Sequence, residues 1–498
     1  MINSRYAWFE ESLKKIALLA SVGGVLAWDQ ETGMPPDAVG IRSQQAGILS
    51  GITHEMRTSQ ALQDCVEELL NDSSLTPYQS VNVKEFHRTL QKSIRLSKEF
   101  VEQLSLTVSA AYPAWYQAKT QNQFDIFAPH LEKIIALKKE EAQLIGYAKH
   151  PYDALMDEFE PGFTVDDADR LFTDMKTSLL PFTKRIASQT QPNDDFFRQP
   201  FDSFSQKKFG RSLLTAMGYK FSSGRMDHSE HPFCIGLHPS DVRVTYRLNP
   251  NDLSEFIWGL MHEGGHALYE QGLQTKYWGT PMGSTVSLAI HESQSRFWEN
   301  NIGRSAPFWK YWFPVLQNTF PDAFKNSDFQ HFYVGINRIA PSLIRIQADE
   351  LTYHFHILIR YQIEKSIFEG NLSVNQIPTV WNNLYKEYLG LDVPNNTSGV
   401  LQDVHWSHGG FGYFPTYSLG SFYAAQFFHA LSAQSPIQEW LEQGQLQPIT
   451  TWLNENIHSK GMELSANELC KKITGESLNF AYFMQYAQQK FNPIFNLS

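Results

Sequence analysis

The chain has 498 residues, of which 42% are hydrophobic, and its formal net charge at pH 7 is −11. Such a chain can bury a large core, whereas its negative charge argues against nucleic acid or an anionic membrane as the main partner. The three cysteines, Cys65, Cys234 and Cys470, form no CxxC pair. We therefore expect a globular, cytoplasmic protein without a disulfide framework, with peptides or small molecules as its partners.

The N-terminal segment "KKIALLASVGGVLAWDQ" has two lysines ahead of an apolar run, which is the charge pattern of a signal peptide. However, Glu10 and Glu11 lie just upstream, and the run is far shorter than the roughly 20 residues that span a membrane. It ends in Trp28-Asp29-Gln30, without a small-residue cleavage site. The segment therefore predicts a buried helix.

Helical periodicity recurs along most of the chain. It is clearest in "LQDCVEELLND", "FAPHLEKIIALKKEEAQLIGYA", "VDDADRLFTDMKTSLLPFTKRIASQ" and "LIRIQADELTYHFHILIRYQIEKSIFEG". In "HPFCIGLHPSDVRVTYRL", by contrast, short runs of β-branched and aromatic residues are typical of a small strand pair. Because no linker or internal repeat interrupts the pattern, we predict a mainly α protein with one domain over residues 1–498.

The helical stretch "FIWGLMHEGGHALYEQGL" carries His262 and His266 with Glu263 between them. Residues four apart lie on one helical face, so both imidazoles can bind one metal ion while the glutamate acts on water beside them. This HExxH pattern is typical of metallopeptidases. Two packed histidines are the structural alternative, but the apolar flanks would bury them without obvious partners, which favours a metal.

Two glycines, Gly264 and Gly265, stand between these histidines. Each weakens a helix by roughly 1 kcal/mol relative to alanine. We infer that a side chain at either position would project toward the metal or into a neighbouring helix, although a mere tolerance of packing would look the same in the sequence.

A catalytic zinc site needs a third protein ligand and one open position. Tyr269 and Gly272 stand where a metzincin carries glycine and histidine, which excludes that class, and Glu270 lies too far along the helix. The next predicted helix, "STVSLAIHESQSRFWENNIG", carries Glu292 and Glu299 two turns apart on one face. Their spacing does not choose between them.

Six motifs follow one another between residues 231 and 406. They are His231-Pro232-Phe233, Asp241 to Thr245 as DxRxT, HExxH, His291-Glu292-Ser293-Gln294 as HES/GQ, Ile344 to Asp349 as I/VRxxAD, and "GVLQDVHW" as GxxQDxHW. With the opening Trp28-Asp29-Gln30-Glu31 and the tail "WLNENIHSKGMELSANELCKKITGES", they resemble the M32 metallocarboxypeptidases, the carboxypeptidase Taq family, nearly end to end.

The resemblance implies a saddle-like, mainly helical fold with a long, deep groove and the β patch near the active site. It also implies one zinc or cobalt ion per chain and a homodimer. It assigns Glu292 as the third ligand, and it implies that His231 and Arg243 bind substrate. Gly264 stands where the family commonly has threonine, and Cys234 stands where a hydroxyl residue is expected, which leaves groove shape and specificity open.

The expected chemistry is hydrolysis of a peptide bond by metal-activated water. Glu263 takes the proton of the water and passes it to the leaving amine. Tyr413 and Tyr417 are candidate donors to the oxyanion, with His405 just upstream. We prefer Tyr417, because "TYSLGSFYAAQFFHAL" looks like the tyrosine-bearing helix of related dicarboxypeptidases and oligopeptidases.

The predicted substrates are peptides with a free C-terminus, and Arg345 is the candidate that binds the terminal carboxylate. A guanidinium suits this role because its planar fork can bind both carboxylate oxygens. We expect Arg345 on an apolar helix, where a salt bridge to Asp349 is the structural alternative. At the level of function, an oligoendopeptidase and a non-catalytic helical scaffold remain open.

Overall fold

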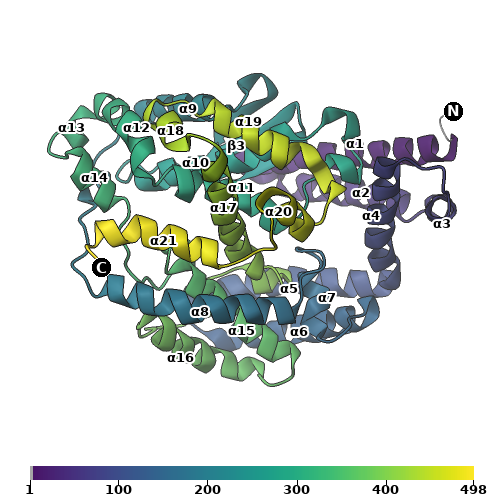
Figure 1. Ribbon diagram of the computed structural model, residues 1–498. Coiled ribbons are helices and arrows are strands. Elements are labelled where there is room, and N and C mark those ends of the chain that lie inside the picture. Colours follow the sequence, from purple (N-terminus) through teal and green to yellow (C-terminus); the bar gives the residue numbers. More distant parts are fainter. Residues whose placement is uncertain (1–3, 498) are drawn as a thin grey trace.

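The computed structural model describes residues 4–497, and helices make up most of them (Figure 1). The α-helices are α1 (Ser4–Thr32), α2 (Val39–Arg57), α3 (Gln60–Leu70), α4 (Pro77–Arg95), α5 (Lys98–Gln121), α6 (Phe124–Ile145), α7 (Pro151–Met156), α8 (Val165–Ala187), α9 (Ser203–Met217), α10 (Ser254–Gly272), α11 (Leu288–Arg296), α12 (Ala306–Thr319), α13 (Pro321–Phe324), α14 (Phe329–Gly335), α15 (Tyr353–Phe368), α16 (Ile377–Leu389), α17 (Pro415–Gln434), α18 (Ile437–Glu442), α19 (Gln447–Asn456), α20 (Ala466–Thr474) and α21 (Ala481–Ile494). The prediction of a mainly α protein is confirmed.

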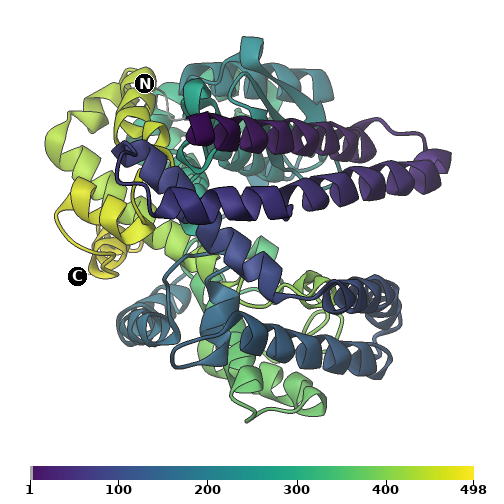
Figure 2. The same cartoon turned by 90° about the vertical axis from the view of Figure 1, so that its right-hand side faces the viewer.

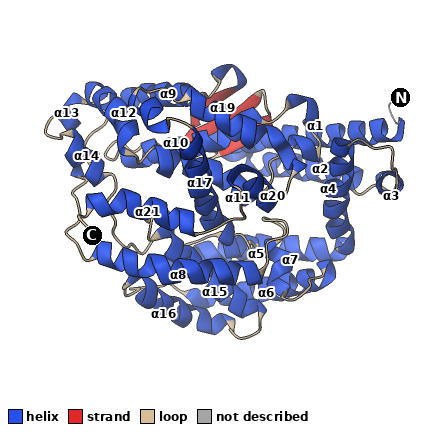
Figure 3. Ribbon diagram, viewed as in Figure 1, coloured by secondary structure: helices blue, strands red, loops and turns tan. Residues whose placement is uncertain are grey.

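A small sheet lies beside α10 (Figure 3). Its strands are β1 (Gly224–His228), β2 (Cys234–His238) and β3 (Asp241–Tyr246), in the order β1-β3-β2. The antiparallel pair β2 and β3 matches the predicted strand pair, and β1, which pairs parallel with β3, was missed. β1 reads "GRMDH", a short polar run that lacks the β-branched and aromatic residues by which strands are found in a sequence.

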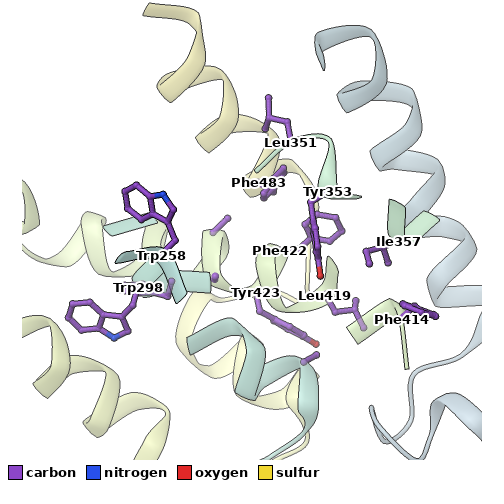
Figure 4. Close-up of a cluster of buried hydrophobic side chains, with 14 of the residues drawn as sticks. Trp258, Trp298, Leu351, Tyr353, Ile357, Phe414, Leu419, Phe422, Tyr423 and Phe483 are labelled. Atoms are coloured by element: carbon purple, nitrogen blue, oxygen red, sulfur yellow. The ribbon is translucent and has the colours of Figure 1, made fainter. Parts of the chain in front are cut away.

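The main hydrophobic core extends from α5 to the C-terminal helix α21. Figure 4 shows part of it, where the ring of Phe422 of α17 lies 5.2 Å from that of Phe483 of α21. α17 crosses the middle of the molecule in Figure 1, packs along α11 and is buried on most of its faces. A second, smaller core joins α1, α3 and α4. The single-domain organisation of residues 1–498 stays a prediction.

The N-terminal helices α1 and α2 form a long hairpin, which faces the viewer in Figure 2. α1 buries its first half, but Leu18 is 55% exposed and Val22 48%. The prediction that this segment forms a buried helix is therefore wrong for one face of its middle, although Leu237 of β2 packs against Gly24 on another face. None of the helices within residues 4–497 combines the length and the apolar character that a membrane span requires.

The helix expected over residues 343–370 begins only at Tyr353. Arg345 lies in a short 3-10 turn, Arg345–Gln347, because Gln402 binds its backbone N–H at 2.9 Å. Asp349 accepts hydrogen bonds from the backbone of Ala340 and Thr352, so it caps a turn before the helix. The placement of Arg345 on a helix is therefore corrected: long-range contacts override the local helical pattern.

Candidate metal centre

Three predicted ligands come together at the contact between α10 and α11. The Nε2 atoms of His262 and His266 lie 3.5 and 3.4 Å from Oε2 of Glu292. Ligand atoms that are each about 2.0–2.1 Å from a tetrahedral zinc ion stand about 3.4 Å apart. The donor set of two imidazoles and one carboxylate, at these separations, fits a divalent metal ion.

The two glycines allow α10 to pack closely against its neighbours. A Cβ atom on Gly265 would stand 2.4 Å from the backbone oxygen of Gln294 and 2.7 Å from Cα of Ser295. Only hydrogen fits at this contact, so Gly265 sets the approach of α10 to the helix that carries Glu292. Gly264 faces the side-chain ends of Leu214 and Met217 on α9 instead.

The two glutamates that the spacing left open have different partners. Glu292 faces the inner nitrogens of both histidines, whereas Oε2 of Glu299 lies 2.9 Å from Nδ1 of His262, the outer nitrogen. Glu299 lies in a π-helical segment, Phe297–Ile302, that continues α11. A partner on the outer nitrogen orients a metal-binding imidazole and sets its tautomer.

Charged neighbours separate the acidities of these carboxyl groups. Burial alone would raise the pKa of Glu292, but Arg296 and His262 hold it well below its usual range. Burial raises the pKa of Glu263 to about 7, although the neighbouring His262 offsets part of this rise. Glu263 is 8% exposed, and among residues 4–497 no donor binds its carboxylate, so it is free to exchange a proton.

His266 is held by a stacked ring. The ring of His291 lies 4.4 Å from it at 18°, and Nε2 of His291 lies 3.0 Å from Oε1 of Glu270. Burial and the neighbouring His291 lower the pKa of His266 to about 3. The imidazole is therefore neutral at pH 7, as a metal ligand must be.

Tyr417 lies in the first turn of α17, and Tyr413 lies two residues before that helix begins. The hydroxyl of Tyr417 is 3.3 Å from Nε2 of His405, and the rings of Tyr413 and Tyr417 meet edge to face at 5.1 Å. Burial lowers the pKa of His405 to about 4, so this imidazole is neutral at pH 7.

Arg345 is buried, with 6% of its surface exposed. Its Nε donates to Oδ1 of Asp403 at 3.0 Å and its Nη1 donates to the hydroxyl of Tyr353 at 3.2 Å. The alternative pairing of Arg345 with Asp349 is wrong, because Asp349 binds backbone N–H groups instead. Asp403 also pairs with Arg360 at 2.5 Å, so two guanidiniums share one carboxylate.

Within residues 4–497, neither His231 nor Arg243 contacts the predicted metal ligands or Arg345. His231 is exposed, and Arg243 donates two hydrogen bonds of 2.8 Å to Asp241 on the same strand. Thr245 of the same motif donates to the backbone oxygen of Phe233, which ties the loop before β2 to β3. The two motifs thus hold each other in place.

Arg296 and Tyr353 were not among the residues predicted for this site. Arg296 stands four residues after Glu292 and three before Glu299, a spacing at which helical ion pairs form, so a search for such pairs would have found it. Tyr353 carried no signal, since its contact with Arg345 depends on the turn that replaces the expected helix.

The chain matches the carboxypeptidase Taq (M32) metallopeptidase family over residues 8–491. It belongs to that family. It is 38% identical to carboxypeptidase 1 of Bacillus subtilis, with 98% of each chain covered, and 36% identical to thermostable carboxypeptidase 1 of Thermus thermophilus, with 97% and 98% covered. The M32 carboxypeptidase from Deinococcus radiodurans is similar in structure, with a TM-score of 0.97, 32% identity, and coverage of 99% of this chain and 100% of that one.

Family membership identifies the chain as a peptide hydrolase of the metallocarboxypeptidase class that requires a divalent metal. Its relatives favour this activity over the oligoendopeptidase and the non-catalytic scaffold.

Proposed function

We propose that this M32 enzyme is a zinc carboxypeptidase that removes C-terminal residues from peptides, with His262, His266 and Glu292 as its metal ligands. The observation that carries the proposal is the pair of distances, 3.5 and 3.4 Å, between the carboxylate oxygen of Glu292 and the two imidazole nitrogens. A cobalt ion suits the same ligands. When bound, the ion would lower the pKa of water and polarise the scissile carbonyl.

Glu263 acts as the general base. Its carboxylate takes a proton from the attacking water and delivers it to the leaving amine, and a pKa near 7 suits both transfers. Tyr417 donates a hydrogen bond to the oxyanion that forms at the carbonyl carbon. His405 orients Tyr417 if its Nε2–H donates to the phenolic oxygen, which leaves the hydroxyl hydrogen free for substrate. Tyr413 lines the same site.

Arg345 binds the terminal carboxylate of the substrate. Arg345 and Arg360 pair with the same carboxylate, that of Asp403. This buried cluster therefore carries a net positive charge, which one more carboxylate would neutralise. Arg345 lies over the ring of Tyr417, with the guanidinium carbon 5.0 Å from the ring centre. A carboxylate bound here would therefore lie beside the oxyanion donor.

The experiment is the digestion of a free peptide and of its C-terminally amidated twin by the zinc-loaded enzyme, followed by mass spectrometry. We expect one-residue ladders from the free peptide only. Arg345→Ala should lower kcat/KM some tenfold to over a hundredfold for free peptides, because it loses a charge-assisted bond of about 1.5–3 kcal/mol. Internal cleavage of both peptides would contradict the proposal.

His231 and Arg243 complete the proposed substrate contacts. Their substitution should raise KM more than it lowers kcat, since residues that bind substrate and transition state equally act on KM. An Arg243→Gln variant with an unchanged KM would remove Arg243 from the proposed substrate contacts.

We also propose a cytoplasmic homodimer. Cys65, Cys234 and Cys470 are free thiols, which fits a reducing compartment. The helix α2 has no buried residue, and Ile41, Ile48 and Ile52 on it are exposed. An apolar helix face of this kind supports contact with a second copy of the chain.

A further inference from the structure

The carboxylate of Glu292 is restrained on every side. Its Oε2, the oxygen that faces both histidines, also accepts a hydrogen bond from Ser295 Oγ at 3.0 Å. Its other oxygen, Oε1, accepts from Nε of Arg296 at 2.7 Å. A Cβ atom on Gly420 of α17 would stand 2.5 Å from Cγ of Glu292, so the backbone of α17 closes the remaining side.

Arg296 reaches two carboxylates at once. While its Nε binds Glu292, its Nη1 donates to Oε2 of Glu299 at 3.0 Å, the same oxygen that lies 2.9 Å from His262 Nδ1. The ring of Tyr353 packs on the guanidinium, with 4.7 Å between the guanidinium carbon and the ring centre. The guanidinium therefore has little freedom to turn, and it fixes the relative position of Glu292 and Glu299.

We propose that Arg296 is the positioning residue of the metal centre: by holding Oε1 of Glu292, it makes this ligand bind through Oε2 alone. A carboxylate free to turn would bind the ion through both oxygens and fill the position that the attacking water needs. Through Glu299, the same guanidinium fixes the ring plane of His262. The inference rests on the proposed function, since it takes Glu292 as a ligand.

The alternative is that Arg296 only neutralises buried acids. Two carboxylates need a positive charge nearby, and loss of one partner of a buried ion pair costs about 3–5 kcal/mol of stability. That role requires the positive charge of Arg296 but not the planar guanidinium that directs two hydrogen bonds. Lysine keeps the charge, yet a single ammonium cannot reproduce the two directed hydrogen bonds.

The test compares Arg296→Gln and Arg296→Lys with the wild type after loading with cobalt. The readouts are the visible absorption spectrum of the cobalt ion and the separate values of kcat and KM. We expect both variants to absorb more weakly than the wild type, because a higher coordination number weakens these bands. We expect kcat to fall roughly 10- to 100-fold with KM within a few fold.

Arg57→Gln is the matched control. Arg57 of α2 donates to Thr89 of α4 at 2.9 Å, away from the metal centre, so its substitution should leave the spectrum unchanged. Circular dichroism checks folding, and if Arg296→Gln does not fold, Arg296→Lys decides. A wild-type spectrum in folded Arg296→Lys overturns the inference, whatever its kcat. A wild type that binds no cobalt, or that cleaves no peptide, contradicts the proposed function instead.

Discussion

Three glutamates within one small volume, Glu263, Glu292 and Glu299, have different surroundings. Glu292 faces two imidazole nitrogens and Arg296, Glu299 faces the outer nitrogen of His262, and Glu263 has no partner among the described residues. Cationic neighbours favour the ionised form of a carboxyl group, and burial without them favours the protonated form. The same side chain is therefore suited to three tasks, and its environment decides which one.

At this scale we predict that Glu263→Gln keeps its metal and loses its activity. The substitution removes the group that exchanges protons while it leaves all three proposed ligands in place. We expect metal stoichiometry by atomic absorption to equal that of the wild type, and kcat to fall at least about a hundredfold. Turnover near the wild-type value would remove Glu263 from the mechanism.

At the scale of elements, the contact between α10 and α11 forms the centre. The backbones of α10 and α11 approach each other so closely that no methyl group would fit on Gly265. Gly264, its neighbour, faces flexible side-chain ends on α9. Two adjacent glycines therefore meet different physical demands.

This difference predicts a contrast between Gly265→Ala and Gly264→Ala. Overpacking against backbone typically costs about 1–3 kcal/mol, whereas alanine gains roughly 1 kcal/mol of helix propensity. Gly265→Ala should lose stability and metal affinity, because α11 must move away. Gly264→Ala should stay near wild type. Urea unfolding and zinc titration measure both, and equal effects of the two substitutions would contradict this account.

A second element-scale prediction concerns Glu160, which binds the N-terminal turn of α11. Its carboxylate accepts from the backbone N–H of Ala289 at 3.2 Å, and burial raises its pKa to about 7. Because the folded pKa exceeds the unfolded value, the unfolded chain releases this proton first as pH rises. The contribution of Glu160 to stability is therefore fully present below about pH 4.5 and is lost as pH rises through about 7.

Comparison with Glu160→Gln, which cannot ionise, isolates this effect. The unfolding free energy of the wild type minus that of the variant should fall by about 3 kcal/mol between pH 4.5 and pH 8, since each unit of pKa shift corresponds to about 1.4 kcal/mol. Urea unfolding at both pH values measures it. If the difference in unfolding free energy were the same at the two pH values, Glu160 would ionise in the folded chain as it does in the unfolded chain.

At the scale of the whole molecule, many of the exposed apolar side chains lie on the N-terminal hairpin of α1 and α2. Ile48 of α2 is 65% exposed, and Cβ atoms on Gly47 and Gly51 would meet nothing within 4 Å. Glycines weaken an exposed helix, and they are favourable where another backbone must approach. The same face is largely uncharged, which suits burial in a two-fold interface.

We therefore predict that Ile48→Glu weakens the proposed dimer. A charge buried at the interface lacks a partner, so the dissociation constant should rise at least tenfold. Light scattering after gel filtration measures the mass. Leu106→Glu, on α5 and 73% exposed, is the control and should change nothing. The proposed interface would be contradicted if the wild type were monomeric, or if Ile48→Glu formed a dimer as readily as Leu106→Glu.

The fold class and the helical spacing of His262 and His266 could be predicted from the sequence because both depend on local spacing. The family could be predicted because six ordered motifs lie between residues 231 and 406. Helical periodicity and the HExxH spacing act within a few residues, so they need no knowledge of distant contacts. The same local periodicity predicted a helix at Arg345. That prediction was wrong because Gln402 and Asp403, from a distant segment, hold Arg345 in a turn.

Spacing alone left Glu292 and Glu299 open, and the family resemblance assigned Glu292 as a ligand. The tertiary structure shows how Glu292 faces the histidines, what surrounds Gly265, and how Arg296 joins two carboxylates. Residues two turns apart on one face, such as Glu292 and Glu299, have the same local signature. The π-helical segment and the crossing of α10 and α11 then turn one toward the inner nitrogens and the other toward the outer nitrogen of His262. The physical reason is that a metal centre is a set of distances between helices, and periodicity along one helix carries no such distance.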